Sequence, residues 1–397
     1  MSWMSILGLS ANFVSKDIET YSKERAEDVS WSAPILSWKK DVTPDQDNAT
    51  NVESSAIAVW ENELYFGTSH RKGVTILDRR NGENIGILDT KASVQSRPTI
   101  VNSSDSSTIL AADISGTIYA WDAKTKNELW TVALNTPVNT EMTLYQDQLF
   151  IATNGDVVYS LSLDGEILWR YAHRADPSRK GKLQLLGAAK PLARQKDVVL
   201  GFSDGAVVRV DRKTADILEQ VWNGSGRYPD IIAQPTDLKD GVLVSGFEKP
   251  TWKQVDKSVR WEQAIGGNHS ALVLEEQNGV LVLHPGGDGI LRKIDSTSGS
   301  VLWSWDSETG AALTMPQMTS SGVFVSSSVG GLWLIDPSSG EPIWTYQTDY
   351  IFAGAMHAPL IVDDQIFLLN KTGILMVFSA LQEKSFDCPD IYCQWVQ

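Results

Sequence analysis

Cysteine is nearly absent from the sequence. The chain has two cysteines in 397 residues, Cys388 and Cys393, both within the last ten positions. A single C-x4-C spacing without a second pair or a nearby histidine is a poor zinc site. The pair indicates a local disulfide that holds the C-terminal tail, with two free thiols or a bound metal as the open alternatives. A disulfide would suit an oxidising compartment.

Catalytic motifs are also missing. The five histidines are scattered, and none lies in an H-E-x-x-H spacing, which would mark a metal-dependent hydrolase. No G-x-S-x-G nucleophile elbow occurs. The pairs Gly266-Gly267 and Gly286-Gly287 do not open helices, so we expect no phosphate cradle there. We therefore predict a protein that is not an enzyme and has no catalytic residues, no cofactor and no metal.

Positive charge and long apolar runs are scarce. The formal net charge is -15 and the sequence pI is about 4.8, which argues against nucleic acid as a partner. No run of 18 or more apolar residues exists, so we expect no membrane-spanning helix. The N-terminus lacks the basic segment and long apolar core of a secretory signal. Either the protein is cytoplasmic, or a signal has been removed.

What the sequence does contain is a repeat. The stretch from Gly289 to Asp295 is typical of a strand, Ser-Thr-Ser-Gly of a tight turn, and the residues up to Trp303 of a second strand. The stretch from Gly331 to Trp344 repeats this unit about 41 residues later. A fixed period of this length indicates a repeat architecture.

Seven complete units and one divided unit fill residues 32–381. Their Gly-strand-Asp halves end at Asp78, Asp122, Leu163, Asp211, Asp256, Asp295 and Asp336, and their outer strands follow at Ile87, Trp130, Trp169, Trp222, Trp261, Trp303 and Trp344. The strand ending at Trp38 lacks the rest of its unit, and residues 353–381 lack an outer strand. We expect these two pieces to pair and close a ring, because closure removes exposed sheet edges.

Dividing residues 32–381 into eight units gives about 44 residues each, the size of a propeller blade. The prediction is an all-β fold, an eight-bladed β-propeller with four-stranded antiparallel blades, closed by an N-terminal strand. A tether over residues 1–31 precedes it, and a tail over residues 382–397 carries the two cysteines.

The repeated residues have a structural explanation. The aspartate can accept hydrogen bonds from the backbone of the turn that follows, and the glycine can take its positive-φ position. The tryptophan is large enough to fill the space between adjacent blades, with its N–H free to reach a partner. Function is therefore expected from the segments that do not repeat.

The longest segment outside the repeat runs from Ala172 to Lys190. It places basic residues, including Arg179 and Lys182, before the sequence Leu183-Gln-Leu-Leu-Gly187. Two interpretations stay open: a docking patch of exposed leucines ringed by charge, or the buried first strand of the fourth blade behind solvated basic residues. A second irregular segment, Gly224 to Asp230, follows one blade later.

The Asp-x-x-Ser/Thr-Gly-x-x-x-Trp repeat resembles that of the propellers named after pyrroloquinoline quinone (PQQ). One branch, the quinoprotein dehydrogenases, binds PQQ and calcium on the propeller axis and typically has adjacent cysteines, which this chain lacks. The other branch is the BamB family, eight-bladed lipoproteins of the outer-membrane β-barrel assembly (Bam) complex. Its loop Leu-x-Leu-Arg-Gly-x-x-x-Pro is similar to Leu183-Gln-Leu-Leu-Gly-Ala-Ala-Lys-Pro191.

That resemblance implies a non-enzymatic scaffold on the periplasmic face of the outer membrane of a Gram-negative bacterium, bound to the POTRA domains of BamA. The implied partner-binding residues are Leu183, Leu185, Leu186, Arg179, Lys182 and Asp230. Leu186 stands where the family has arginine, and Arg179 or Lys182 would supply the charge. Unfolded outer-membrane proteins are a further expected partner, through β-addition.

Membership of the BamB family would also imply a lipidated cysteine at the mature N-terminus. No cysteine stands near Met1, so any contact with the membrane is expected only through a lipid anchor that this sequence does not show. The alternatives are a PQQ-dependent dehydrogenase and a general protein-interaction propeller.

Overall fold

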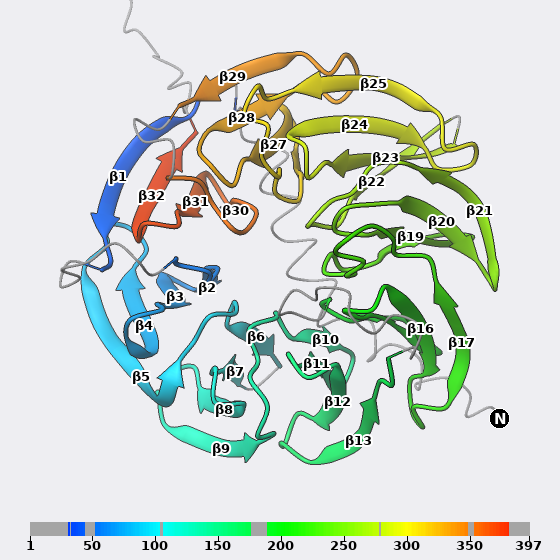
Figure 1. Ribbon diagram of the computed structural model, residues 1–397. Helices are drawn as coiled ribbons and strands as arrows, with labels where there is room; N and C mark the ends of the chain where they lie inside the picture. The colour runs from blue at the N-terminus through cyan, green and yellow to red at the C-terminus, as the bar shows by residue number, and fades with distance from the viewer. Residues whose placement is uncertain are drawn as a thin grey trace, which may run out of the picture.

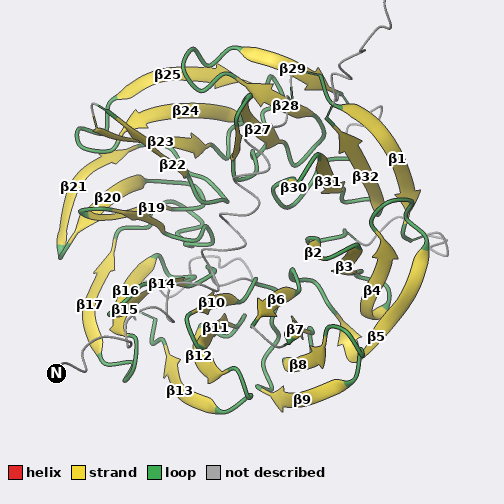
Figure 2. Ribbon diagram, turned by 180° about the vertical axis from the view of Figure 1, so that it is seen from behind, coloured by secondary structure: helices red, strands yellow, loops and turns green. Residues whose placement is uncertain are grey.

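The computed structural model describes residues 31, 33–43, 52–103, 106–175, 189–277, 279–347 and 353–380. These residues form eight four-stranded sheets arranged in a ring (Figure 1). The view from behind shows strands and loops without a helix (Figure 2). Among the described residues there is thus no helix that could cross a membrane. The predicted all-β, eight-bladed propeller is confirmed.

Each of the first four blades runs from an innermost to an outermost strand in chain order. Blade one contains β2 (Ala58–Trp60), β3 (Glu63–Gly67), β4 (Lys72–Asp78) and β5 (Asn84–Ser93). Blade two contains β6 (Thr99–Asn102), β7 (Ser107–Ala112), β8 (Thr117–Asp122) and β9 (Glu128–Ala133). Blade three contains β10 (Thr143–Tyr145), β11 (Gln148–Ala152), β12 (Val157–Ser162) and β13 (Ile167–Ala172). Blade four contains β14 (Leu192–Ala193), β15 (Asp197–Gly201), β16 (Ala206–Asp211) and β17 (Ile217–Trp222).

The remaining blades follow the same order, except that the last one borrows its outer strand. Blade five contains β18 (Thr236–Leu238), β19 (Gly241–Ser245), β20 (Thr251–Val255) and β21 (Ser258–Gln263). Blade six contains β22 (Leu272–Glu276), β23 (Gly279–Pro285), β24 (Ile290–Asp295) and β25 (Val301–Asp306). Blade seven contains β26 (Gln317–Thr319), β27 (Gly322–Ser326), β28 (Leu332–Ile335) and β29 (Pro342–Tyr346). Blade eight contains β30 (Leu360–Val362), β31 (Gln365–Leu369), β32 (Ile374–Ser379) and β1 (Ile35–Asp41).

The ring closes as expected. β1 pairs antiparallel with β32, from Ile35 opposite Ser379 to Asp41 opposite Ile374. Trp31, just ahead of this strand, is fully buried and meets Phe324 of β27 edge to face at 5.8 Å. The closing strand is thus held both by its own blade and by contact with blade seven.

Strand alternation gives the ring two different faces. Because neighbouring strands are antiparallel, every connection from an outer strand to the next innermost strand lies on one face, with the hairpins between second and third strands. We call this the crossover face. The opposite face, the turn face, has the hairpins between first and second strands and between third and fourth strands.

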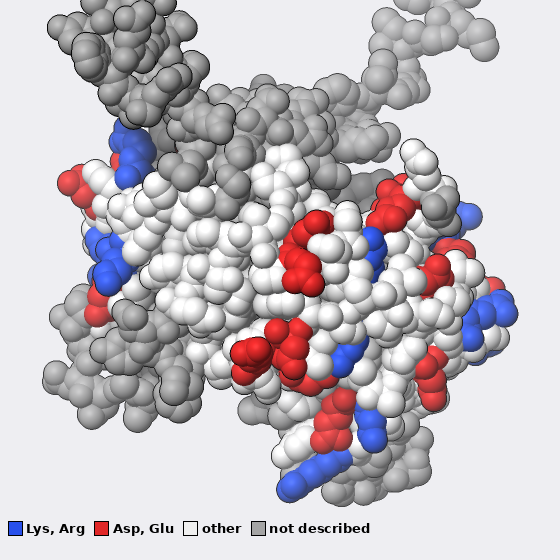
Figure 3. Space-filling view, turned by 90° about the horizontal axis from the view of Figure 1, so that it is seen from above, with Lys and Arg blue, Asp and Glu red and all other residues white. Residues whose placement is uncertain are grey.

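The core lies between blades. Buried residues from neighbouring sheets form each apolar cluster, as Leu110 and Ile118 of blade two do with Leu149 and Leu161 of blade three. The outer strands are different, because every second or third residue is exposed: Leu302 of β25 and Ile343 of β29 are 54% and 45% accessible. The rim of blades six and seven accordingly shows charges of both signs scattered over a wide uncharged surface (Figure 3).

The aspartate and the glycine act in the turn as predicted. The Asp295 carboxylate accepts hydrogen bonds from the backbone N–H groups of Thr297 (2.9 Å) and Ser298 (2.7 Å). Gly299 follows at a φ of +77°, which is the left-handed region that favours glycine. Backbone hydrogen bonding lowers the pKa of Asp295, so it stays ionised in this role.

The tryptophans fill the joints between blades, also as predicted. Trp303 of blade six donates its indole N–H to the carbonyl of Pro337 in blade seven (3.3 Å). A Cβ on Gly340, in the turn of blade seven, would lie 2.8 Å from the Trp303 ring. The glycine is therefore needed twice, for the backbone conformation and for the close approach of the ring. Trp130 and Trp261 make the same pair of contacts with Gly165 and Gly299.

The predicted outer strands are confirmed, with Ile87 in β5 and Trp222 in β17, but neither of these two residues fills the joint between blades. In the regular blades the tryptophan faces the residue just before a β-bulge, as Trp303 faces Lys293. The equivalent positions are Gly86, opposite Ile76, instead of Ile87, and Glu219, opposite Arg209, instead of Trp222. Only the bulge register aligns these strands, so neither apolar type nor the presence of a tryptophan identifies the joint position.

Candidate functional site

The predicted partner-binding loop falls mostly outside the part of the chain that the structure describes. Of its predicted contact residues, Asp230 is described, and the others lie within residues 176–188: Arg179, Lys182, Leu183, Leu185 and Leu186. Cys388 and Cys393 are likewise outside the described residues. The predicted role of these residues stays a prediction, and the geometry comes from what flanks them.

The chain entering this loop is fixed by His173, which follows β13. Its imidazole stacks on Phe202 with ring centroids 4.2 Å apart, and its Nε2 lies 3.1 Å from Asp204. Burial raises the pKa of Asp204, but hydrogen bonds from His173 and Trp222 outweigh it and hold the pKa at about 2. An ionised Asp204 therefore makes Nε2 the protonated nitrogen of this histidine.

The chain leaving the loop is fixed at the centre of the ring. Ala189 is buried, and the Lys190 ammonium lies 2.9 Å from the Glu141 carboxylate of the neighbouring blade. The carbonyl of Pro191 accepts hydrogen bonds from the Thr143 hydroxyl (2.6 Å) and from the Gln234 amide (3.0 Å). Both anchors lie on the crossover face.

Asp230 lies inside the protein at the junction of blades four and five. Its side chain is fully buried, and its carbonyl accepts a hydrogen bond from the N–H of Phe247 (2.8 Å). The next residue, Ile231, donates its N–H to the carbonyl of Phe202 (3.0 Å). Phe202 thus brings the segment around Asp230 together with His173, although a buried carboxylate does not present itself to a partner in this structure.

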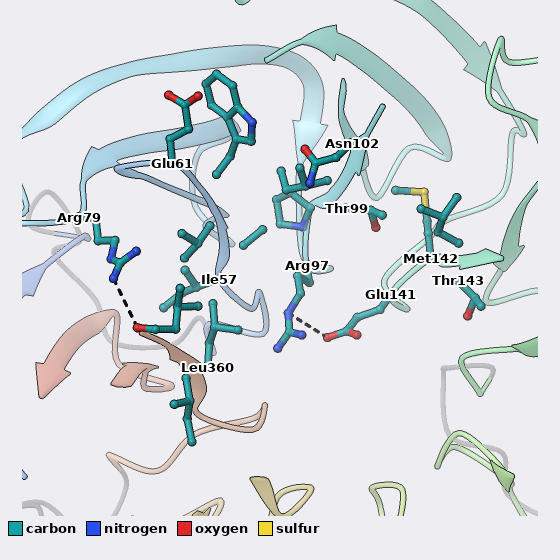
Figure 4. Close-up of a pocket in the computed structure, with 18 of the residues that line it drawn as sticks. Ile57, Glu61, Arg79, Arg97, Thr99, Asn102, Glu141, Met142, Thr143 and Leu360 are labelled. Carbon is teal, nitrogen blue, oxygen red and sulfur yellow. Dashed lines mark hydrogen bonds and ion pairs between the residues drawn. The ribbon is translucent and has the colours of Figure 1, made fainter. Parts of the chain in front are cut away.

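A pocket with a cavity volume of about 770 Å³ lies on the axis of the ring, beside this face. Innermost strands of blades eight, one, two and three line it, and Figure 4 shows their side chains pointing into the space between them. Apolar walls come from Ile57, Val59, Ile100, Met142, Leu144 and Leu360. These residues are mostly half-buried, so the pocket is open to solvent.

One carboxylate at the crossover end of the pocket contacts two cationic side chains and a histidine. Glu141 lies 3.5 Å from the Nε of Arg97, 2.9 Å from the Nζ of Lys190 and 3.4 Å from the Nδ1 of His357. Burial raises the pKa of Glu141, but Arg97, Lys190 and His357 outweigh it and keep the pKa well below its usual range. The Nε2 of His357 points at the carbonyl of Ser54, so that nitrogen carries a proton.

At the turn-face end, the pocket is bordered by a second ion pair. Arg79 of blade one and Asp363 of blade eight approach to 2.8 Å, across the joint that β1 closes (Figure 4). The pocket therefore runs along the innermost strands from the cluster around Glu141 to the pair of Arg79 and Asp363.

Sequence reasoning missed this pocket. Arg97, Glu141 and Lys190 each stand just before an innermost strand, at corresponding places in successive blades. The residues differ in type from blade to blade, so they do not show up as a repeat. Their position in the sequence could have identified them. Arg97, Lys190 and Gln234 each stand directly before a proline that opens a blade.

Comparison with known proteins identifies the family of this chain. The family described as outer membrane protein assembly factor BamB matches residues 70–287 and 287–384. The chain belongs to this family. BamB of Shewanella oneidensis is 23% identical over 272 residues, an alignment that covers 66% of this chain and 66% of that relative, just under two thirds of its length.

Solved structures agree with this BamB assignment at the level of fold. The crystal structure of BamB from Moraxella catarrhalis superimposes with a TM-score of 0.69 at 16% identity, over 87% of this chain and all of that one. Sqt1 from Chaetomium thermophilum superimposes with a TM-score of 0.67 at 10% identity, over 88% of this chain and all of that one. At such identities the likeness shows the propeller alone.

The axial residues of this BamB-family chain fit PQQ and calcium poorly. Glu141 is engaged by Arg97, Lys190 and His357, and Asp363 by Arg79. Within the described ranges no group of three or more His, Cys, Asp or Glu side chains could hold a metal ion. A calcium ion needs several free oxygen ligands, and these carboxylates are engaged elsewhere.

Proposed function

We propose that this chain is a non-enzymatic scaffold of the Bam complex, which binds the POTRA domains of BamA at the periplasmic face of the outer membrane and supports the folding and insertion of outer-membrane proteins. The observation that carries the proposal is the match of the BamB family along residues 70–384. A closed eight-bladed ring is a rigid support, because each blade is packed between two neighbours.

The partner-binding surface of the proposal is the loop over residues 176–188. Leu183 and Leu185 are its apolar anchors, and Arg179 and Lys182 supply the charge that Leu186 does not. Apolar anchors surrounded by charge are typical of an interface hot spot. The described residues on either side of this segment support the proposal, because His173 and Lys190 are both fixed to the propeller.

Asp230 belongs to the proposal in a different way. A buried side chain can bind a partner only if the surrounding segment moves. Its segment contacts Phe202, which also holds His173, and this supports a positioning role for Asp230.

A second part of the proposal is that extended segments of unfolded outer-membrane proteins bind to the propeller. Each described outer strand is paired on one side only and exposes apolar residues such as Leu129 and Leu302, both 54% accessible. A free edge with apolar side chains can accept an extended chain by β-addition.

A pull-down against the periplasmic domains of BamA from the same organism tests the proposal. The Leu183→Asp/Leu185→Asp variant should lose binding while its melting temperature stays unchanged. A matched control is Leu302→Asp, an exposed leucine on blade six, which should bind as the wild type does.

Three other results would contradict the proposal. A wild type that does not bind BamA would leave only the fold. Binding that survives in the double variant would move the interface away from the loop and favour a general interaction propeller. Uptake of PQQ in the presence of calcium, followed by its absorbance and by dye reduction, would favour the dehydrogenase alternative.

A further inference from the structure

The axial pocket combines apolar side chains with the edges of β-strands. Its walls are apolar, and they are built from the innermost strands β2, β6, β10 and β30. Each of these strands is the first in its sheet, and among the described residues it has a strand partner on one side only. The backbone donors and acceptors of the other edge therefore face the axis.

One end of the pocket is positively charged. Arg97 and Lys190 together carry two positive charges against the single negative charge of Glu141, before any proton on the second nitrogen of His357 is counted. The excess is notable because the whole chain has a net charge of -15. A second anion is attracted to a site that keeps one positive charge in excess in a partly buried setting.

We propose that this pocket binds the C-terminal end of an extended polypeptide whose last residues are apolar. The terminal carboxylate lies beside Arg97 and Lys190, and the apolar side chains contact the walls formed by residues such as Ile100 and Leu144. The peptide backbone runs along a free edge of an innermost strand, as in β-addition. This proposal is independent of the proposed BamA-binding segment.

Two ligands could combine a carboxylate with an apolar body, a polypeptide and a simple apolar acid. The unpaired strand edges favour the polypeptide. A hydrocarbon chain would cover the free backbone groups of β2 or β6 without bonding them, which is unfavourable. A peptide would satisfy them. The segment from Arg97 to Asn102 follows one wall of the pocket, and at about 3.3 Å per residue it leaves room for about five extended residues.

The competing explanation is that the cluster only ties blades together. Arg97, Glu141, Lys190 and His357 come from the entries to blades two, three, four and eight, so their contacts join blades around the axis. A purely structural cluster would bind neither a peptide nor its carboxylate. The test must therefore separate affinity from stability.

The experiment uses the full chain and a fluorescent hexapeptide, Val-Thr-Val-Thr-Val-Leu, in two forms. One form has a free C-terminal carboxylate, and the other is amidated. Fluorescence anisotropy should show that the amide binds about tenfold more weakly, which is the loss expected for one charge-assisted hydrogen bond. Equal affinity for the two forms, or no binding of either, overturns the proposal.

Variants locate the site. Lys190→Gln and Arg97→Gln should weaken binding of the carboxylate peptide about tenfold and leave the amide unaffected. Lys239→Gln is the matched control, because Lys239 lies on the surface with a 68% exposed side chain, and it should change nothing. If one of the two pocket variants fails to fold, the other still tests the site.

Glu141→Gln gives the sharpest result. It removes the carboxylate that competes with the ligand, so the free-acid peptide should bind several-fold more tightly even though the melting temperature falls. A purely structural cluster predicts no gain in affinity, and a loss of binding contradicts the proposal. Dodecanoate is the last comparison: if it binds and the peptide does not, the site belongs to a small apolar acid and the proposal is wrong.

Discussion

The two faces of the ring follow different rules. On the turn face, the joint of blades six and seven repeats that of blades five and six, since Trp303 lies over Gly340 as Trp261 lies over Gly299 and each indole N–H bonds a backbone carbonyl. On the crossover face, the residues that enter successive blades are Arg97, Glu141 and Lys190, which differ in charge and in partner. The comparison teaches that the repeated residues make one structural contact, while the residues on the crossover face vary from blade to blade.

At two joints of the turn face the tryptophan itself is missing. At the joint of blades one and two, Gly86 leaves the tryptophan position empty, and Lys126 takes the place of the turn glycine at a φ of +63°. The Lys126 ammonium pairs with Glu63 and lies 4.8 Å from the ring of Trp60. A cation held between an aromatic ring and a carboxylate thus replaces the tryptophan contact.

The second of these joints lies between blades four and five. Here Glu219 occupies the tryptophan position, pairs with Arg209 at 2.9 Å and accepts a hydrogen bond from Gln254 of blade five at 2.6 Å. A cavity of about 160 Å³ lies beside these residues. Blade five has only Asp256 and Lys257 in its turn, so no glycine is there to receive a ring.

The largest effect is expected at a regular joint. Trp169→Ala should lower the free energy of unfolding by about 3–5 kcal/mol, because it leaves a cavity between blades three and four and removes the bond to the carbonyl of Arg212 (2.8 Å). Urea denaturation measures it. The matched control is Trp222→Ala, which removes an outer-strand tryptophan that is 38% exposed. Equal losses for the two variants would show that the joint has no special role.

Glu219→Ala should cost less, about 2 kcal/mol. Removing a buried carboxylate leaves Arg209 and Gln254 without that partner, but Arg209 keeps its contact with Asp197 at 3.2 Å. Denaturation at neutral pH measures the loss. Glu219→Gln keeps an acceptor of the same shape and should fall between the alanine variant and the wild type. A glutamine variant as unstable as the alanine variant would mean that charge alone matters at this joint.

His284 lies on the crossover side of the joint between blades five and six. We expect it to make the free energy of unfolding depend on pH. Its Nε2 lies 3.0 Å from the hydroxyls of Ser245 and Thr251, and burial, helped by Arg292, lowers its pKa from 6.5 to about 4. The unfolded chain binds the proton first, so this contribution to stability is complete above pH 6.5 and is lost as the pH falls towards 4. The slope is at most about 1.4 kcal/mol per pH unit.

Denaturation curves at several pH values check this. His284→Asn keeps a polar side chain near Ser245 and Thr251 but cannot titrate, so its stability should change less between pH 6.5 and 4. If wild type and variant lose stability in parallel, another group is responsible.

The smallest effect tests whether the two kinds of joint can be exchanged. Lys126→Gly should lower stability by about 1 kcal/mol, because the loss of the contacts with Glu63 and Trp60 exceeds the relief at positive φ. Adding Gly86→Trp should recover part of this loss by restoring a ring over a glycine. A double-mutant cycle followed by thermal denaturation measures the coupling. If the effects of the two substitutions are additive, the joint of blades one and two cannot be converted into a tryptophan–glycine joint in this way.

Most of the fold could be predicted from the sequence, because each repeated residue has a structural role. Asp295, Gly299 and Trp303 recur because one turn and one joint recur, so the number of blades and the closing strand could be predicted. Glu219 and Gly86 could not, since only the bulge register identifies their positions. The cluster of Arg97, Glu141 and Lys190 escaped because it forms across blades, between residues about 45 positions apart that share no type.

The closing strand also constrains the order in which the protein folds. β1 stands near the start of the chain, yet its partner β32 is the last described strand. Blades one to seven can each form as soon as their own residues are available, because their pairings are local. The ring cannot close until almost the entire chain is present, and such a long-range pairing carries a large loop-closure entropy. Until that moment, blade eight has an open edge and blade seven an uncovered Phe324, so the unfinished ring is the state in which this protein is most exposed to aggregation and to proteases.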